Sequence, residues 1–113
     1  AQKEFKSILF ENLKWVVSST AQYLKEELVE MKKKCSLLVL DPPRVGLDRE
    51  SCHWIGELSP KEIIYVSCNP MTLVRDLKLI LAKGRLRVDS IQGVDMFPQT
   101  THMEIITILK NRV

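Results

Sequence analysis

The stretch that most constrains the fold covers residues 63–76, where an apolar run leads directly into a helix start. Its first four residues are β-prone and predict a buried strand. Asn69 is a favourable N-cap residue, and Pro70 then takes the first helical position, where a missing N–H costs nothing. Apolar residues recur at helical spacing beyond it. Cys68 is therefore expected between the carboxyl end of a strand and the amino end of a helix.

This position gives Cys68 two interpretations. Unpaired backbone N–H groups at a helix start favour negative charge, so a thiolate there is a plausible nucleophile. A free cysteine is also commonly a small buried core residue. Position alone leaves both interpretations open.

Composition limits the class of protein. The chain has 113 residues, of which 45% are hydrophobic and 27% charged, and this is typical of one small globular domain. A formal net charge of +3 is compatible with an RNA partner. No apolar run is long enough to span a membrane, and no signal peptide pattern is present. We therefore expect no membrane association.

The three cysteines indicate a reducing setting. Their number is odd and they form no Cys-x-x-Cys pair, so a cytoplasmic location is the simplest expectation. The sequence contains no constellation of residues with metal-ligand spacing, and we expect no metal site.

The alternation of strands and helices predicts an α/β sheet that is mostly parallel, with helices on both faces. The last two strands are joined by too short a link for a crossover helix, so they should form an antiparallel pair. The expected helices are Gln2–Asn12, Ala21–Lys33 and Arg49–Leu58, besides the helix after Asn69, and the other expected strands are Leu13–Ser18, Leu37–Leu40, Arg85–Gln92 and Met103–Leu109.

This topology brings three chemically active side chains to one edge of the sheet. An antiparallel strand begins where its parallel neighbours end, so Glu104 should lie at the same edge as Asp41 and Cys68. Ligands bind at that edge in open α/β sheets. The alternative interpretations are a turn aspartate for Asp41 and a surface carboxylate at a strand end for Glu104.

Three motifs carry a resemblance to a known family. They are Asp41–Arg44, then Ser67–Pro70 followed by Thr72 and Arg75–Asp76, then Asp95–Pro98 followed by His102 and Glu104. With these motifs in this order, the sequence resembles the RNA (uracil-5-)-methyltransferase family, which makes 5-methyluridine in tRNA and rRNA from S-adenosylmethionine. The resemblance implies a partial Rossmann-like class I methyltransferase sheet.

The resemblance also implies a reaction. Uracil C5 is a poor nucleophile, but a thiolate that adds to C6 raises the electron density at C5, which can then accept a methyl group. A base must next remove the C5 proton so that the thiolate is eliminated. This chemistry needs one cysteine and one general base on the same ring, and no metal. The resemblance assigns these roles to Cys68 and Glu104.

Further site residues follow from the same resemblance. It places Asp41 beside the cofactor or the target base, and Thr20 near the adenine of S-adenosylmethionine. Arg44, Asn69 and His102 are expected to contact the RNA, and His102 could also orient Glu104. A base in folded RNA would have to be extruded to reach such a pocket.

Two features of related methyltransferases do not occur in the sequence: the glycine-rich cofactor turn and the preceding RNA-binding domain. We therefore expect residues 1–113 to be the carboxyl-terminal portion of a methyltransferase catalytic domain, inactive alone. One side of the strand at residues 37–40 would then lack a neighbour, which predicts a homodimer. Two alternatives stay open: a non-catalytic interaction module with this fold, and an amino-group methyltransferase that uses Asp41-Pro42-Pro43.

Overall fold

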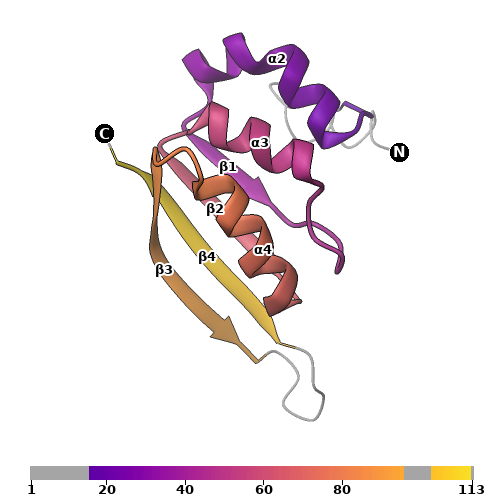
Figure 1. The fold of residues 1–113 in the computed structure, drawn as a ribbon, viewed down its shortest axis with the longest axis vertical. Coiled ribbons are helices and arrows are strands. Elements are labelled where there is room, and N and C mark those ends of the chain that lie inside the picture. Colours follow the sequence, from indigo (N-terminus) through magenta and orange to yellow (C-terminus); the bar gives the residue numbers. More distant parts are fainter. Residues whose placement is uncertain (1–15, 96–102, 113) are drawn as a thin grey trace, which may run out of the picture.

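The computed structural model describes residues 16–95 and 103–112, which form an α/β fold around one four-stranded sheet (Figure 1). The strand order is β1-β2-β4-β3. β1 and β2 are parallel, and β4 runs antiparallel to both of its neighbours. The α/β class and the antiparallel pair at the carboxyl end are thus confirmed. The strands are β1 (Leu37–Leu40), β2 (Glu62–Ser67), β3 (Leu86–Val94) and β4 (Glu104–Asn111).

Helix starts and ends follow the local sequence signals. The Ser19 side chain accepts a hydrogen bond from the backbone N–H of Gln22 at 3.1 Å, which caps the first described helix. Asn69 caps the helix that begins with Pro70, as predicted. Gly84 has a φ of +74°, and its N–H donates to the Leu81 carbonyl at 3.0 Å, so the chain turns after this helix. The helices are α2 (Thr20–Lys34), α3 (Arg49–Leu58) and α4 (Pro70–Leu81).

The core lies between the sheet and α3 and α4, which cover the same face of it (Figure 1). Alternate residues of β2 point into this layer, so Ile63 and Tyr65 are fully buried. Ile55 from α3, Ile80 from α4 and Leu109 from β4 complete its centre. α2 packs against α3 and so belongs to the same helical layer.

The helices in the described part of the chain lie on one face of the sheet, whereas helices on both faces were expected. The connections from β1 to β2 and from β2 to β3 step in the same direction along the sheet. Right-handed crossovers keep their helices on one face for as long as that direction is maintained. The opposite face therefore presents half-buried apolar residues of β2 and β4, namely Ile64, Val66, Ile106 and Ile108.

β1 is only partly buried, although all four of its residues are apolar. It lies at the edge of the described sheet, and Leu37 and Val39 are 50% and 59% exposed. The strand expected at Leu13–Ser18 is absent from the described residues 16–18, because they pair with no strand of the sheet. The rest of that segment, and the helix expected at Gln2–Asn12, lie outside the described residues. No described helix has the length and apolar character needed to cross a membrane.

Candidate active site

The carboxyl edge of the parallel strands brings three of the predicted site residues together. Ser67, the last residue of β2, pairs with Ile105 of β4. Cys68 follows Ser67 and Glu104 precedes Ile105, so the antiparallel register carries both to the same level of the sheet. Asp41 directly follows β1 in the neighbouring position along this edge. The convergence predicted from topology is therefore present in the backbone.

The loop that carries Cys68 is held by its neighbours in the chain. The Ser67 hydroxyl donates to the Asn69 carbonyl at 3.0 Å and accepts from the Asn69 N–H at 3.1 Å. These two bonds close a tight turn around Cys68, which is half-buried. The turn thus fixes the backbone on both sides of the thiol without using the thiol itself.

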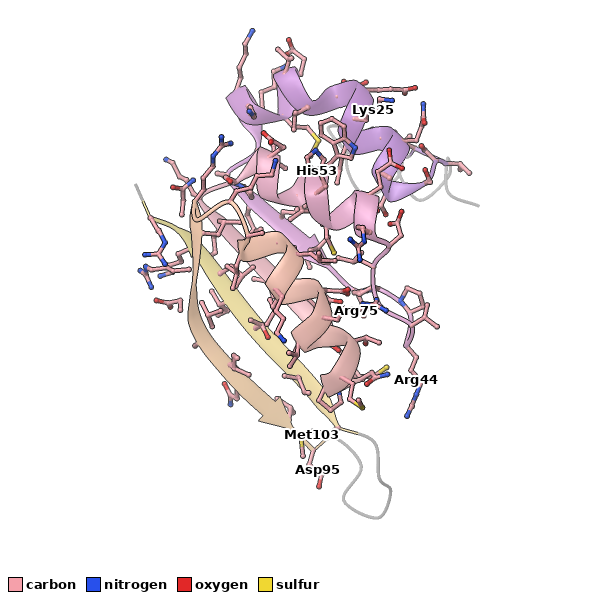
Figure 2. The ribbon with its side chains drawn as sticks, in the orientation of Figure 1. Lys25, Arg44, His53, Arg75, Asp95 and Met103 are labelled. Atoms are coloured by element: carbon pink, nitrogen blue, oxygen red, sulfur yellow. The ribbon has the colours of Figure 1, made fainter. Side chains whose placement is uncertain are left out.

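Besides its predicted role as the N-cap of α4, Asn69 has a second structural role that was not predicted, which is to hold the loop after β1. Its side-chain oxygen accepts from the Met71 N–H at 3.0 Å, and its amide nitrogen donates to the Arg44 carbonyl at 3.2 Å. The Thr72 hydroxyl donates to the same carbonyl at 3.1 Å. The first turn of α4 therefore holds the loop after β1, while the Arg44 side chain extends outward from that loop (Figure 2).

Beneath this loop lies a buried carboxylate, that of Asp76 on α4, which is 0% exposed. One of its oxygens accepts from the Tyr65 hydroxyl at 2.5 Å and from the Leu47 N–H at 2.8 Å. The other accepts from Arg75 Nε and Nη2 at 3.1 and 3.0 Å. A buried charge is tolerated only when it is paired and hydrogen-bonded, and here both conditions are met. We call Tyr65, Arg75 and Asp76 the clamp.

The clamp also holds the loop through Arg75, whose position is shown in Figure 2. Its Nη2 donates to the carbonyls of Val45 and Leu47 at 2.8 and 3.0 Å. Arg75 and Asp76 follow Cys68 in the predicted helix, a position from which pairing with the surrounding loops is expected, and these bonds confirm it. Tyr65 was not predicted as a residue of the site. A signal was available, because a tyrosine within a buried strand needs a partner for its hydroxyl. Burial, followed by the hydrogen bond to Asp76, raises the pKa of Tyr65 and keeps it a donor.

A groove of about 420 Å³ lies between the start of α2 and β1. Thr20 and Leu40 are among its lining residues, and the exposed Asp41 directly follows Leu40. Apolar side chains of α2 and β1 line the groove together with the hydroxyl-bearing residues Ser18, Ser19 and Thr20. This donor set fits one side of a nucleoside, with an apolar surface for a ring and polar groups for its edge. His102 lies outside the described residues.

No metal centre is formed in the described ranges 16–95 and 103–112, where no three His, Cys, Asp or Glu side chains are placed so that they could hold a metal ion. What this site offers is a thiol, two carboxylates and a groove with hydroxyl-bearing residues in its lining. These groups suit nucleophilic and acid–base chemistry.

Because the loop lies close against the clamp, we expect Gly46→Ala to lower the free energy of unfolding strongly. Gly46 has a φ of +80°, and a Cβ there would stand 2.7 Å from Asp76 Oδ2 and 2.8 Å from Arg75 Nη2. Gly84 is the matched control, because its φ is +74° and nothing lies within 4 Å of its Cβ position. Left-handed backbone alone costs an alanine about 1–2 kcal/mol. Urea unfolding should show that Gly46→Ala lowers the free energy of unfolding clearly more than Gly84→Ala. Equal losses would contradict this account of the clamp.

Because Cys52 and Cys68 lie in different surroundings, we expect an alkylating reagent to modify Cys68 and not Cys52. Cys52 is 0% exposed, and burial, with a further contribution from Asp76, raises its pKa to about 12. The thiolate is the reactive form, so Cys52 should be inert in the folded protein. Treatment with iodoacetamide at neutral pH, followed by peptide mass spectrometry, should find the half-buried Cys68 modified and Cys52 unmodified. Denaturant should abolish the difference, and early modification of Cys52 would count against it.

Comparison with known proteins identifies the family of the chain. Uncharacterized RNA methyltransferases of Fusobacterium nucleatum and Enterococcus faecalis are 36% and 46% identical to this chain, over 99% and 82% of its length. The chain spans only 24% and 20% of the length of these relatives. The crystal structure of the Pyrococcus abyssi tRNA (uracil-54, C5)-methyltransferase in complex with S-adenosyl-L-homocysteine matches with a TM-score of 0.58 at 39% identity, over 66% of this chain and 18% of that one. The model of the tRNA (uracil-5-)-methyltransferase family matches residues 10–112, and the chain belongs to this family.

Proposed function

We propose that this chain supplies the nucleophile and the general base of an RNA uracil C5-methyltransferase that acts on a uridine of tRNA or rRNA. The observation that carries the proposal is the register of β2 and β4, which brings Cys68 and Glu104 to one level of the sheet edge. The family match supports the reaction class. Because the chain spans a small part of its relatives, we propose that it is the carboxyl-terminal portion of the catalytic domain.

In the proposed reaction, the Cys68 thiolate adds to C6 of uracil and forms a C6–S bond, and the ring electrons shift toward C5 and O4. C5 then takes a methyl group. Glu104 removes the remaining C5 proton, the electron pair re-forms the C5=C6 bond, and the thiolate leaves. The sequence of bonds requires one nucleophile and one base at the same ring.

S-adenosylmethionine would supply the methyl group as a sulfonium donor, and the Pyrococcus abyssi enzyme supports this choice because its structure is a complex with S-adenosyl-L-homocysteine. Thr20 in the lining of the groove and Asp41 at the end of β1 are the residues of this chain that would hold it. The groove presents one side of such a site. We therefore propose that the isolated chain is inactive and that the intact enzyme works in the cytoplasm.

The exposed Arg44 side chain, which has no ion pair among the described residues, and His102 would contact the RNA around the target uridine. A guanidinium binds phosphate oxygens in a bidentate fork, which suits this position. Asn69 would act on the RNA indirectly, by fixing the Arg44 carbonyl. The target base must leave its stack to reach Cys68.

The proposed roles predict different defects in the full-length protein. Cys68→Ala should abolish both methylation and the covalent complex with RNA, because no C6–S bond can form. Glu104→Gln should still form the complex but release it slowly, because the C5 proton stays in place. Methyl transfer to RNA and a denaturing-gel shift of labelled RNA measure the two effects.

Cys35→Ala is the matched control, since Cys35 lies outside the site after α2 and should be replaceable without loss. RNA that carries 5-fluorouridine should trap the wild-type complex, because fluorine at C5 is not removed as a proton is. Normal methylation by Cys68→Ala would falsify the proposal.

We further propose that the 113-residue chain on its own forms a homodimer through the outer edge of β1. Leu37 and Val39 are 50% and 59% exposed there, and unpaired apolar edges recruit another strand. Sedimentation equilibrium at micromolar concentration should show twice the monomer mass of 13.0 kDa. Val39→Lys should shift the population to monomer, because edge lysines block pairing. A wild-type chain that sediments only as monomer would contradict the dimer.

A further inference from the structure

We propose that Asp76 is a positioning residue: together with Tyr65 and Arg75 it fixes the loop of residues 41–47 against α4, and thereby sets Asp41 and Arg44 relative to Cys68. This inference rests on the proposed function and deepens it. None of the three clamp side chains is assigned to contact substrate or cofactor. They act through the loop that carries residues which do.

Each partner of the Asp76 carboxylate comes from an element that builds the site. Tyr65 belongs to β2, which ends just before Cys68. Leu47 closes the loop that begins with Asp41 after β1. Asp76 itself is on α4, whose first turn follows Cys68. One buried carboxylate therefore joins the two strand ends and the helix around which the site is arranged.

The loop has little else to hold it. Most of its residues between Asp41 and Asp48 are exposed, and Val45 is 72% exposed, so burial of apolar surface comes mainly from Leu47, which packs against the core at the end of the loop. Its attachments are hydrogen bonds: Asn69 and Thr72 hold the Arg44 carbonyl, and Arg75 holds the carbonyls of Val45 and Leu47. The placement of the loop thus depends on polar contacts, in which the ionised carboxylate of Asp76 orients the Arg75 guanidinium.

The approach of the backbone to the clamp is close enough for the two to move together. A Cβ at Gly46 would overlap the Asp76 carboxylate and the Arg75 guanidinium, so any shift of the clamp is transmitted to the loop. A displacement of about 1 Å in catalytic groups can cost about 100-fold in rate, even when the mutation lies away from the chemistry. Weakening the clamp should therefore slow the chemical step more than it weakens RNA binding.

Tyr65→Phe tests this in the full-length protein, because it keeps the buried ring and removes only the hydroxyl that reaches Asp76. The rate of covalent complex formation with RNA containing 5-fluorouridine is measured at saturating RNA, and the dissociation constant for RNA is measured separately. We expect complex formation to be about 10- to 100-fold slower, with a dissociation constant close to that of the wild type. Arg75→Ala, which releases the same loop from the helix side, should give the same pattern.

Ile80→Val is the control for stability. Ile80 is 1% exposed on the same helix, its apolar side chain makes no hydrogen bond to the carboxylate, and the substitution is mildly destabilising. It should form the complex at the wild-type rate at temperatures well below its unfolding transition. The double variant Tyr65→Phe/Arg75→Ala should be little slower than the slower single variant, because both substitutions release the same loop.

Wild-type rates of complex formation in both Tyr65→Phe and Arg75→Ala would overturn the positioning role. So would an equal slowing by Ile80→Val, since this would mark the defect as one of stability. Failure of the wild-type protein to form any complex is a separate result, which would contradict the proposed function and this inference with it.

Discussion

The candidate site depends on the charge of one buried carboxylate. Removing an ionised group from water costs several kcal/mol, so Asp76 requires compensation from Arg75, the Tyr65 hydroxyl and the Leu47 N–H. Loss of any partner leaves a buried polar group unsatisfied, which is why the strand, the helix and the loop must adopt one mutual arrangement. The same arrangement requires a glycine at position 46. The loop backbone can approach the Asp76 carboxylate this closely only where the residue has no side chain.

The direction in which the chain crosses the sheet determines where the site can form. Both helical connections step the same way, so their helices share one face and the loops that carry Asp41 and Cys68 both emerge at the carboxyl edge. β4 then inserts between β2 and β3 in the opposite direction and brings Glu104 to this edge from its amino end. A fully parallel sheet would place the first residue of that strand at the far edge. The antiparallel strand is therefore what brings Glu104 to the level of Cys68 at this edge.

Features of the fold that depend on residues close together in the sequence were predicted correctly. The bounds of β1 and α3, the Asn69 cap and the Pro70 helix start agree with the structure because capping chemistry and apolar periodicity act over a few residues. Contacts between distant residues were not predictable in this way. The bond from Leu47 to Asp76 joins positions 29 apart, and periodicity says nothing about which donor a buried carboxylate finds. Segment 16–18 has β-prone residues but no partner strand, and a strand requires both.

Cys52 and Cys68 show that the surroundings of a cysteine, and not its residue type, determine how readily its thiol ionises and reacts. Cys52 packs under the helical layer, where burial and the Asp76 charge raise its pKa to about 12 and keep its proton in place. Cys68 occupies a turn whose hydrogen bonds are all made by Ser67 and Asn69, so the turn would keep its shape whether the thiol is free or bonded to a uracil ring. The proposed role of Cys68, in which its sulfur forms and breaks a bond in each cycle, requires this independence. The charge of Asp76 thus contributes twice: it holds the loop in place, and it disfavours ionisation of Cys52.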